Sequence, residues 1–129
     1  MFRPHSSNNG AVLPFEYLPA AAGNYEAGQL LNMSGGKLVA ISTACKTTPA
    51  YLCMGKHTVA DGENLPVTRV SDDVIYETEL SAEAAAAVPG SKIEITAGGL
   101  AVDAAAAGTF ELVFLEGTAA GSMVRGRFA

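Results

Sequence analysis

Short runs of alternating apolar and polar residues, separated by glycine turns, are the feature that most constrains this fold. In the stretch SKIEITAGGLAVDA, residues 91–104, Ile93 and Ile95 alternate with polar residues. Gly98 and Gly99 then interrupt the pattern before a second alternating run. A period of two indicates a half-buried strand, and glycines between two such runs indicate a tight turn. The stretch therefore predicts a β-hairpin.

The same organisation recurs along most of the chain. QLLNM and KLVAIS flank Ser34, Gly35 and Gly36, which predicts a second hairpin with glycine available for positive φ. Further strands are expected in the segments 50–59, 64–70, 73–80, 109–117 and 122–128. Strict alternation in the run that starts at residue 110 places Phe110, Leu112 and Phe114 on one face.

One segment favours a helix. In SAEAAAAVPG, residues 81–90, Ser81 suits an N-cap, alanine is the best helix former, and Pro89-Gly90 ends the run. We therefore expect an all-β fold, a barrel or sandwich of short antiparallel strands with one short Ala-rich helix. Residues 23–129 are expected to form this single β-rich domain.

Residues 1–22 read differently and predict an N-terminal arm. Residues 1–10 are polar and are expected to be flexible, whereas Pro14 and Pro19 favour extended backbone in the segment that follows. The apolar side chains that are expected to contact a partner through this arm are Val12, Leu13, Phe15, Tyr17 and Leu18.

Composition excludes two classes of partner. The chain of 129 residues has a formal net charge of -5, so general attraction to nucleic acid is not expected. No stretch approaches the roughly eighteen apolar residues of a membrane span, and no apolar segment follows the N-terminal residues as in a secretory signal.

The composition of the core favours an oligomer. Only 7% of the residues are aromatic, and a core of small side chains gains stability from oligomerisation.

Few side chains suit catalysis. His57 lies in an expected strand, where a solvent-facing imidazole is the simpler interpretation than a general base. Glu77 and Glu79 share one strand face roughly 7 Å apart, which would resemble a glycosidase pair only beneath a pocket. The sequence therefore predicts no catalytic residue.

The other reactive side chains lack metal-ligand spacing. Asp72 and Asp73 are adjacent at a strand start, so their side chains point to opposite faces. Cys45 and Cys53 match no zinc framework, and we expect two reduced thiols rather than a disulfide, although strands on either side of KTTPAY would allow one. No metal and no cofactor are expected.

Three arginines are the remaining candidates for a binding site. Arg69, Arg125 and Arg127 are cationic residues in an acidic chain, and they would form a patch that pairs with an acidic partner. Solvated strand charges are the alternative interpretation of the same residues.

Three stretches, residues 22–42, 49–80 and 88–128, together carry a resemblance to a known family. Its elements are the hairpin GQLLNMSGGKLV, the segment PVTRV, the later GSKIEI and the terminal GSMVRGRF. In this order they resemble the small head-decoration proteins of tailed bacteriophages, also called cement or capsid-stabilising proteins. The resemblance implies a β-rich domain that forms homotrimers on the capsid surface and an N-terminal arm that contacts the lattice of the major capsid protein. It also implies synthesis in the cytoplasm of a bacterial host, and it transfers no catalytic residue.

Two other functions remain open from the sequence. One is a carbohydrate- or receptor-binding β module of a phage tail fibre or cell surface, against which the absence of Trp counts. The other is an enzyme that uses Glu77, Glu79 or His57, which would require a pocket lined by those side chains.

Overall fold

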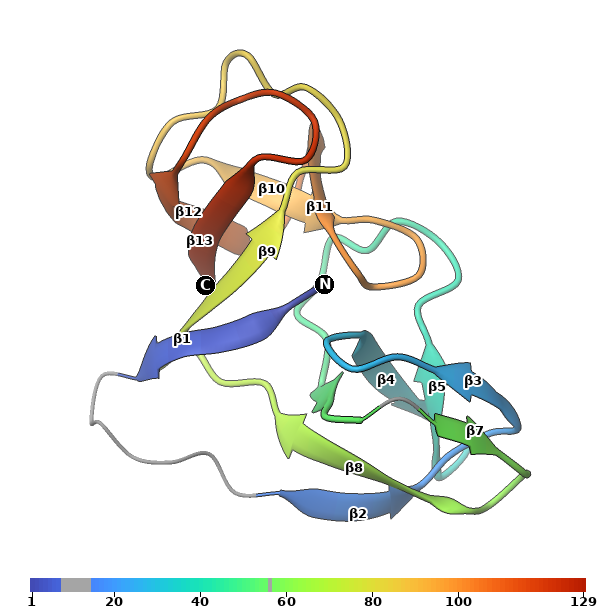
Figure 1. Ribbon diagram of the computed structural model, residues 1–129. Coiled ribbons are helices and arrows are strands. Elements are labelled where there is room, and N and C mark those ends of the chain that lie inside the picture. Colours follow the sequence, from blue (N-terminus) through green and yellow to red (C-terminus); the bar gives the residue numbers. More distant parts are fainter. Residues whose placement is uncertain (8–14, 56) are drawn as a thin grey trace.

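The computed structural model describes residues 1–7, 15–55 and 57–129 (Figure 1). Strands make up 53% of the structure, and no helix occurs in the described residues. The strands form sheets of six, five and two strands, none of which closes into a barrel. The all-β class is thus confirmed, and the arrangement is consistent with a sandwich.

Six strands form the larger sheet, in the order β1-β9-β13-β12-β10-β11, and neighbouring strands are antiparallel. Their bounds are β1 Arg3–Ser7, β9 Val74–Glu79, β10 Lys92–Ile95, β11 Val102–Ala107, β12 Phe110–Leu115 and β13 Met123–Phe128.

Five strands form the second sheet, in the order β2-β8-β6-β4-β5, also antiparallel. Their bounds are β2 Glu16–Pro19, β4 Leu30–Ser34, β5 Lys37–Ala40, β6 Tyr51–Cys53 and β8 Asn64–Arg69. A two-stranded sheet pairs β3 Gly23–Tyr25 with β7 His57–Val59. An isolated parallel bridge between Ala20 and Leu38 brings the two edges of the five-stranded sheet together.

Both expected hairpins are confirmed. β4 and β5 pair around Gly35 and Gly36, whose φ angles of +57° and +81° suit glycine. β10 and β11 pair antiparallel, and β11 continues to Ala107 through alanines that the sequence places in a loop. In the turn between β10 and β11, the Gly99 carbonyl oxygen accepts a hydrogen bond at 2.8 Å from the Leu30 amide of β4. The tip of one hairpin therefore contacts the other sheet.

The larger hydrophobic core lies between the two sheets. Leu30 of β4 and Leu52 of β6 are fully buried in the same cluster as Phe110 and Phe128 of the six-stranded sheet. A smaller cluster lies within the five-stranded sheet and includes Tyr25 of β3. Because the larger core takes side chains from both sheets, the two sheets pack against one another through it.

The N-terminal residues differ from the expectation of a flexible arm. Phe2 is 1% exposed, and its ring centroid lies 5.6 Å from that of Phe110 and 6.2 Å from that of Phe128. Its amide donates a hydrogen bond to the Gly28 carbonyl oxygen at 2.8 Å, and β1 then pairs with β9. For residues 1–7 the expectation is wrong, because Phe2 fills a gap among side chains that are distant in sequence.

The expected helix at residues 81–90 is also wrong, since these residues form turns and irregular structure. The Ala84 amide donates to the Thr118 carbonyl oxygen at 2.8 Å, and the Val88 amide donates to the Ser91 hydroxyl at 3.1 Å. A helix of about two turns is marginal without tertiary support, so bonds to other segments outweigh the propensity of alanine.

Candidate functional site

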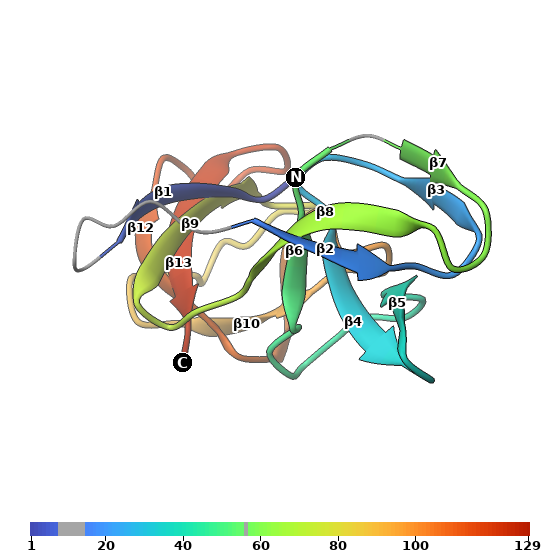
Figure 2. The same ribbon diagram turned by 90° about the horizontal axis from the view of Figure 1, so that it is seen from below.

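Two exposed aromatic side chains lie at β2, Phe15 just before it and Tyr17 within it, and β2 is an edge strand of the five-stranded sheet that runs beside β8 (Figure 2). Phe15 and Tyr17 are 53% and 65% exposed. Leu18 points the other way and packs against the smaller core. The other two expected contact residues, Val12 and Leu13, lie outside the described residues. Phe15 and Tyr17 therefore carry the exposed apolar surface of this segment.

Arg69 of β8 lies on the opposite face of this sheet from Tyr17, because it pairs with Tyr51 and alternates with Pro66, the partner of Tyr17. Its guanidinium carbon lies 5.4 Å from the centroid of the Tyr51 ring, and Nη2 donates to the Tyr51 hydroxyl at 3.3 Å. Its Nε lies 3.8 Å from a carboxylate oxygen of Glu16. Stacking on an aromatic ring restricts an arginine side chain and orients its charge. We call the exposed residues Phe15 and Tyr17 the β2 surface, to which Glu16 and Arg69 do not belong.

A second candidate surface crosses the outer face of the six-stranded sheet. Arg3 of β1 and Arg125 of β13 flank Glu77 of β9 in the strand register. Arg3 Nε donates to one oxygen of the Glu77 carboxylate at 2.8 Å, and Arg125 Nε donates to the other at 3.0 Å. The Arg125 guanidinium also lies 5.2 Å from the ring centroid of Phe114 on β12. We call these four residues the Glu77 row.

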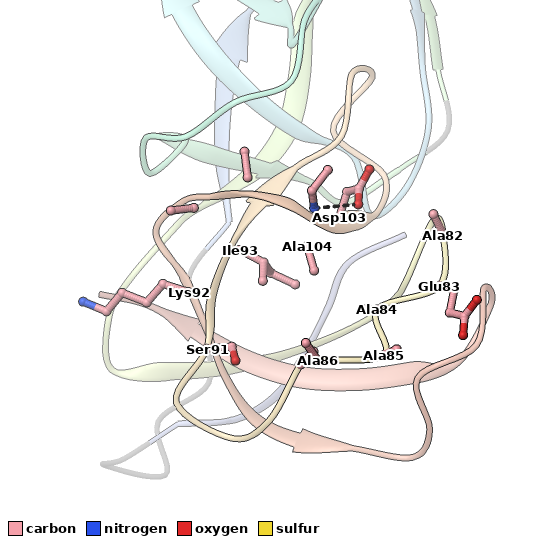
Figure 3. Close-up of a pocket in the computed structure, with 14 residues that line it drawn as sticks. Ala82, Glu83, Ala84, Ala85, Ala86, Ser91, Lys92, Ile93, Asp103 and Ala104 are labelled. Carbon is pink, nitrogen blue, oxygen red and sulfur yellow. Dashed lines mark hydrogen bonds between the residues drawn. The ribbon is translucent and has the colours of Figure 1, made fainter.

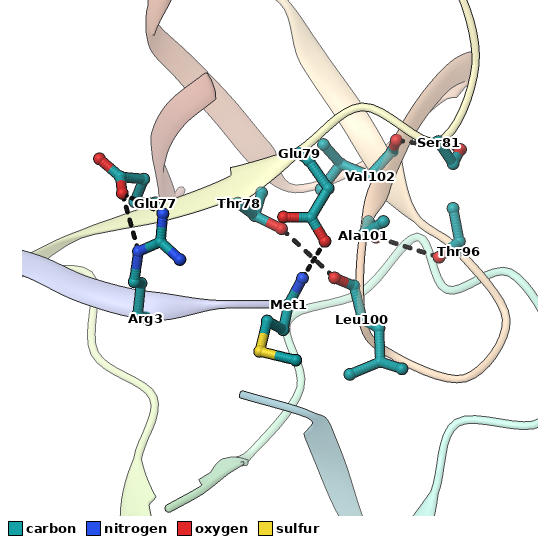
Figure 4. A network of polar contacts seen from close by, with 10 residues as sticks. All are labelled: Met1, Arg3, Glu77, Thr78, Glu79, Ser81, Thr96, Leu100, Ala101 and Val102. Carbon is teal, nitrogen blue, oxygen red and sulfur yellow. Dashed lines mark hydrogen bonds and ion pairs between the residues drawn. The ribbon is translucent and has the colours of Figure 1, made fainter. Parts of the chain in front are cut away.

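Figure 4 shows how β1 is held against β9 at one end of this row. Arg3 reaches Glu77, and the N-terminal amino group of Met1 pairs with the Glu79 carboxylate. A similar arginine–glutamate contact lies further along β13. Here Arg127 Nε and Nη2 donate to one carboxylate oxygen of Glu111 at 3.0 and 2.9 Å. Glu77, Glu79 and Glu111 thus each accept a bond from a cation.

The three arginines expected to form one patch are divided between two sheets. Arg125 and Arg127 lie two residues apart on β13, with 31% and 47% of their side chains exposed. Arg69 lies on β8 in the five-stranded sheet. The structure therefore does not bring Arg69 together with the other two.

Glu77 makes the stability of the fold sensitive to acid. Hydrogen bonds from Arg3 and Arg125 hold the pKa of its carboxyl below the ordinary value of 4.5. A group whose pKa is lower in the folded state stabilises the fold above its unfolded pKa, and the effect is lost as pH falls through the folded value. We expect the free energy of unfolding to fall from about pH 5 downward, and less steeply in a Glu77→Gln variant.

Urea unfolding followed across this pH range measures both slopes. Glu116→Gln is the matched control, because Glu116 is an exposed carboxylate just beyond β12. Equal acid slopes for Glu77→Gln and the natural protein would show that the Glu77 row contributes nothing to stability.

The other titratable candidates are dispersed. His57 is exposed on β7, and Asp72 and Asp73 are exposed in the turn before β9. Within the described ranges, no group of three or more potential metal-ligating side chains was found. Cys45 and Cys53 are both free, and burial raises the pKa of the Cys53 thiol.

Phe114 is the surface residue that sequence reasoning placed incorrectly. A register shift between Leu112 and Phe114 breaks the alternation of β12, so Val113 and Phe114 are both exposed, at 38% and 43%. Such a β-bulge turns a side chain to the other face of a sheet. The uninterrupted apolar run LVFL in β12 is consistent with a bulge but does not locate one.

Comparison with known proteins assigns no family. Neither a protein-family model nor a curated protein matches the chain. A search for membrane-spanning segments in the described residues found no helix of sufficient length and apolar character.

Proposed function

We propose that this protein is a non-enzymatic structural protein of a bacteriophage particle, which binds the assembled head as an oligomer and stabilises it. The observation that carries the proposal is the presence of two exposed aromatic surfaces on different sheets, one of them beside an arginine. The β2 surface exposes Phe15 and Tyr17, and the Glu77 row holds Phe114 against Arg125. Aromatic side chains and arginine are the residue types most enriched at the centres of protein interfaces.

The two surfaces lie on different sheets, with β2 and β12 far apart in the molecule (Figure 1). Because the larger core joins both sheets, the surfaces belong to one packed body. A body with two separated binding surfaces bridges neighbouring subunits of a lattice. Binding to the assembled shell alone stabilises that shell by linkage. Several such bodies in one trimer would gain avidity of about a hundred- to ten-thousand-fold.

The charges fit a partner that offers carboxylates. The outer face of the six-stranded sheet carries the cations Arg3, Lys92, Arg125 and Arg127. The three arginines already bond glutamates of the same face, so a carboxylate of the partner would share or replace these bonds. Arginine in particular forms paired hydrogen bonds with carboxylates.

Electron microscopy tests the location of the protein. Antibody raised against the purified protein should label the heads of virions produced by the strain that encodes it. Labelling of tails only, or of no part of the particle, would refute the proposal. Sedimentation equilibrium should give the mass of a trimer.

Substitution on the β2 surface tests the contact itself. Phe15→Ser with Tyr17→Ser should lower the amount of protein on particles by about tenfold or more, as expected for interface aromatics. Val88→Ser is the matched control, because Val88 is 58% exposed in the loop before β10. Undiminished binding of the double variant would show that the β2 surface is not a contact. These substitutions are preferable to deletion of residues 1–22, which would also remove Phe2 from the core.

A second candidate, binding of a carbohydrate, is favoured by the exposed ring of Tyr17. An exposed aromatic face is a common platform for sugars, and Tyr17 is 65% exposed. Selective binding on a glycan array, lost in Tyr17→Ser and kept in Val88→Ser, would favour this function over the first.

A further inference from the structure

A buried carboxylate in β10 has no partner among the described residues. Glu94 is 8% exposed, and Ile93 and Ile95 on either side of it belong to the larger core. The Glu94 side chain therefore points to the outer face of the six-stranded sheet. Within the described part of the chain, its carboxylate forms no ion pair and no hydrogen bond. A buried charge without a partner costs free energy, which a bound cation would recover.

A second carboxylate lies directly opposite the first. The antiparallel register of β10 and β11 pairs Glu94 with Asp103, so the two side chains stand side by side on one face of the sheet. The Cβ atoms of such a pair are about 4.5–5.5 Å apart, and like charges in this arrangement destabilise a sheet. A cation between the two carboxylates would replace this repulsion with attraction.

Side-chain cations of the described residues do not neutralise this pair, since none forms an ion pair with either carboxylate. Lys92 is the cation of β10 and lies two residues before Glu94. Figure 3 shows that the Lys92 side chain extends away from Asp103. The arginines of the six-stranded sheet bond glutamates of β9 and β12 instead.

The backbone beside the pair supplies further oxygen atoms. The register that pairs Glu94 with Asp103 resumes only at Ala107, so residues 104–106 bulge out of the ladder and their carbonyl oxygens have no partner in β10. The Ala105 amide donates to Oδ1 of Asp103 at 3.0 Å, which leaves Oδ2 available (Figure 3). Carboxylate and carbonyl oxygens are therefore present on the same short segment.

Solvent reaches both carboxylates. Asp103 lines a cavity of about 730 Å³, whose other lining residues are mostly alanines of the segments 82–87 and 104–107 (Figure 3). The Glu94 carboxylate oxygens also keep some contact with solvent, because no side-chain oxygen of the described residues is both fully enclosed and without a partner. An ion can therefore enter from solution.

We propose that Glu94 and Asp103 bind a calcium ion on the outer face of β10 and β11. Calcium takes carboxylate, backbone carbonyl and water oxygens as ligands, and it tolerates irregular geometry better than magnesium does. The sequence pattern did not indicate this site, because the two residues are distant along the chain and only the strand register brings them together. The site is separate from the β2 surface and the Glu77 row, so it goes beyond the contacts proposed for binding to particles.

Titration with calcium chloride tests the proposal. The salt is added at neutral pH to isotope-labelled full-length protein, and binding is followed by NMR. We expect the largest amide shifts at residues 93–95 and 102–107, with a dissociation constant of about 0.1–1 mM, as for weak calcium sites. Three results would overturn the proposal: larger shifts elsewhere, the same shifts with sodium chloride at equal ionic strength, or no saturation by about 10 mM calcium.

Two variants and a control distinguish this site from general attraction of cations to an acidic protein. Glu94→Gln and Asp103→Asn should each weaken calcium binding by about tenfold or more. Asparagine keeps an oxygen that can accept the Ala105 amide, so the bulge is preserved. Glu111→Gln removes a partly buried glutamate of the same sheet, and it should change the affinity by less than about twofold. Equal losses in all three variants would contradict a specific site.

Stability provides a second readout. Without calcium the facing carboxylates repel, so Glu94→Gln should unfold at a higher urea concentration than the natural protein. Calcium at about 10 mM should raise the urea midpoint of the natural protein but not that of the variant, because a ligand that binds the folded state stabilises it.

A proton shared between the two carboxyl groups is the competing explanation of the buried pair. In that case calcium would leave the midpoint of the natural protein unchanged, and the proposal would be wrong. Because neither assay uses a virion, the outcome is independent of whether the protein binds phage heads.

Discussion

Phe2→Ala should lower the free energy of unfolding by about 3 kcal/mol, the lower end of the range for loss of a buried phenylalanine. The ring is 1% exposed and packs edge-on against Phe110, so its removal leaves a cavity in the larger core. Urea unfolding at neutral pH measures the change.

Two further variants make the result decisive. Phe15→Ala removes an aromatic side chain that is 53% exposed, and it should change the free energy of unfolding by no more than about 0.5 kcal/mol. Phe2→Leu keeps most of the apolar volume and should cost less than about 1.5 kcal/mol if Phe2→Ala proves too unstable to measure. An effect of Phe2→Ala no larger than that of Phe15→Ala would mean that the N-terminus does not occupy the core.

Gly99→Ala should be comparably severe, with an expected loss of about 2–5 kcal/mol. Gly99 has a φ of +71°, and a Cβ there would lie 2.5 Å from the Leu30 carbonyl oxygen of the facing sheet. The substitution therefore combines backbone strain with a clash at the point where the hairpin tip meets β4.

The neighbouring glycine separates these two causes. Gly98 has a φ of +91°, but no atom lies within 4 Å of a Cβ built on it. Gly98→Ala should therefore cost only the strain, about 1–2 kcal/mol. Equal losses at the two positions, measured by urea unfolding, would show that Gly99 does not contact Leu30 closely.

The Gly98-Gly99 pair also shows which features of the fold local sequence can predict and which it cannot. Alternation around the two glycines was sufficient to predict that β10 and β11 pair as a hairpin. It gave no indication that the tip bonds to Leu30, because that residue is separated from Gly99 by most of the chain. Local patterns specify a strand and its turn, whereas the partner of the turn depends on how the sheets pack.

The predictions of a flexible N-terminus and of a helix in the alanine segment are wrong for the same physical reason. A polar N-terminus suggests a flexible arm, and four alanines at 84–87 suggest a helix, when each is considered alone. In the structure, Phe2 packs with Phe110 and Phe128, and the Ala84 amide bonds to Thr118. Contacts between residues distant in sequence outweigh weak local preferences in both places.

The candidate surfaces were likewise predictable only in part. Phe15 and Tyr17 stand out in the sequence as aromatic residues in a segment that Pro14 and Pro19 bias towards extended backbone. The separation of Arg69 from Arg125 depends on the sheet to which each strand belongs, and the exposure of Phe114 depends on one bulge in β12. The alternation of residues along a strand does not tell which sheet the strand joins or where a bulge interrupts it.

The amino-acid sequence by itself determined that this protein is built from short antiparallel strands joined by glycine turns, since a period of two and positive φ are local properties. Tertiary structure alone decided that Phe2 completes the core, that residues 81–90 are not helical and that they border a cavity together with β11. These outcomes depend on packing and hydrogen bonds between distant segments, whose free energies exceed the local preferences that a sequence displays.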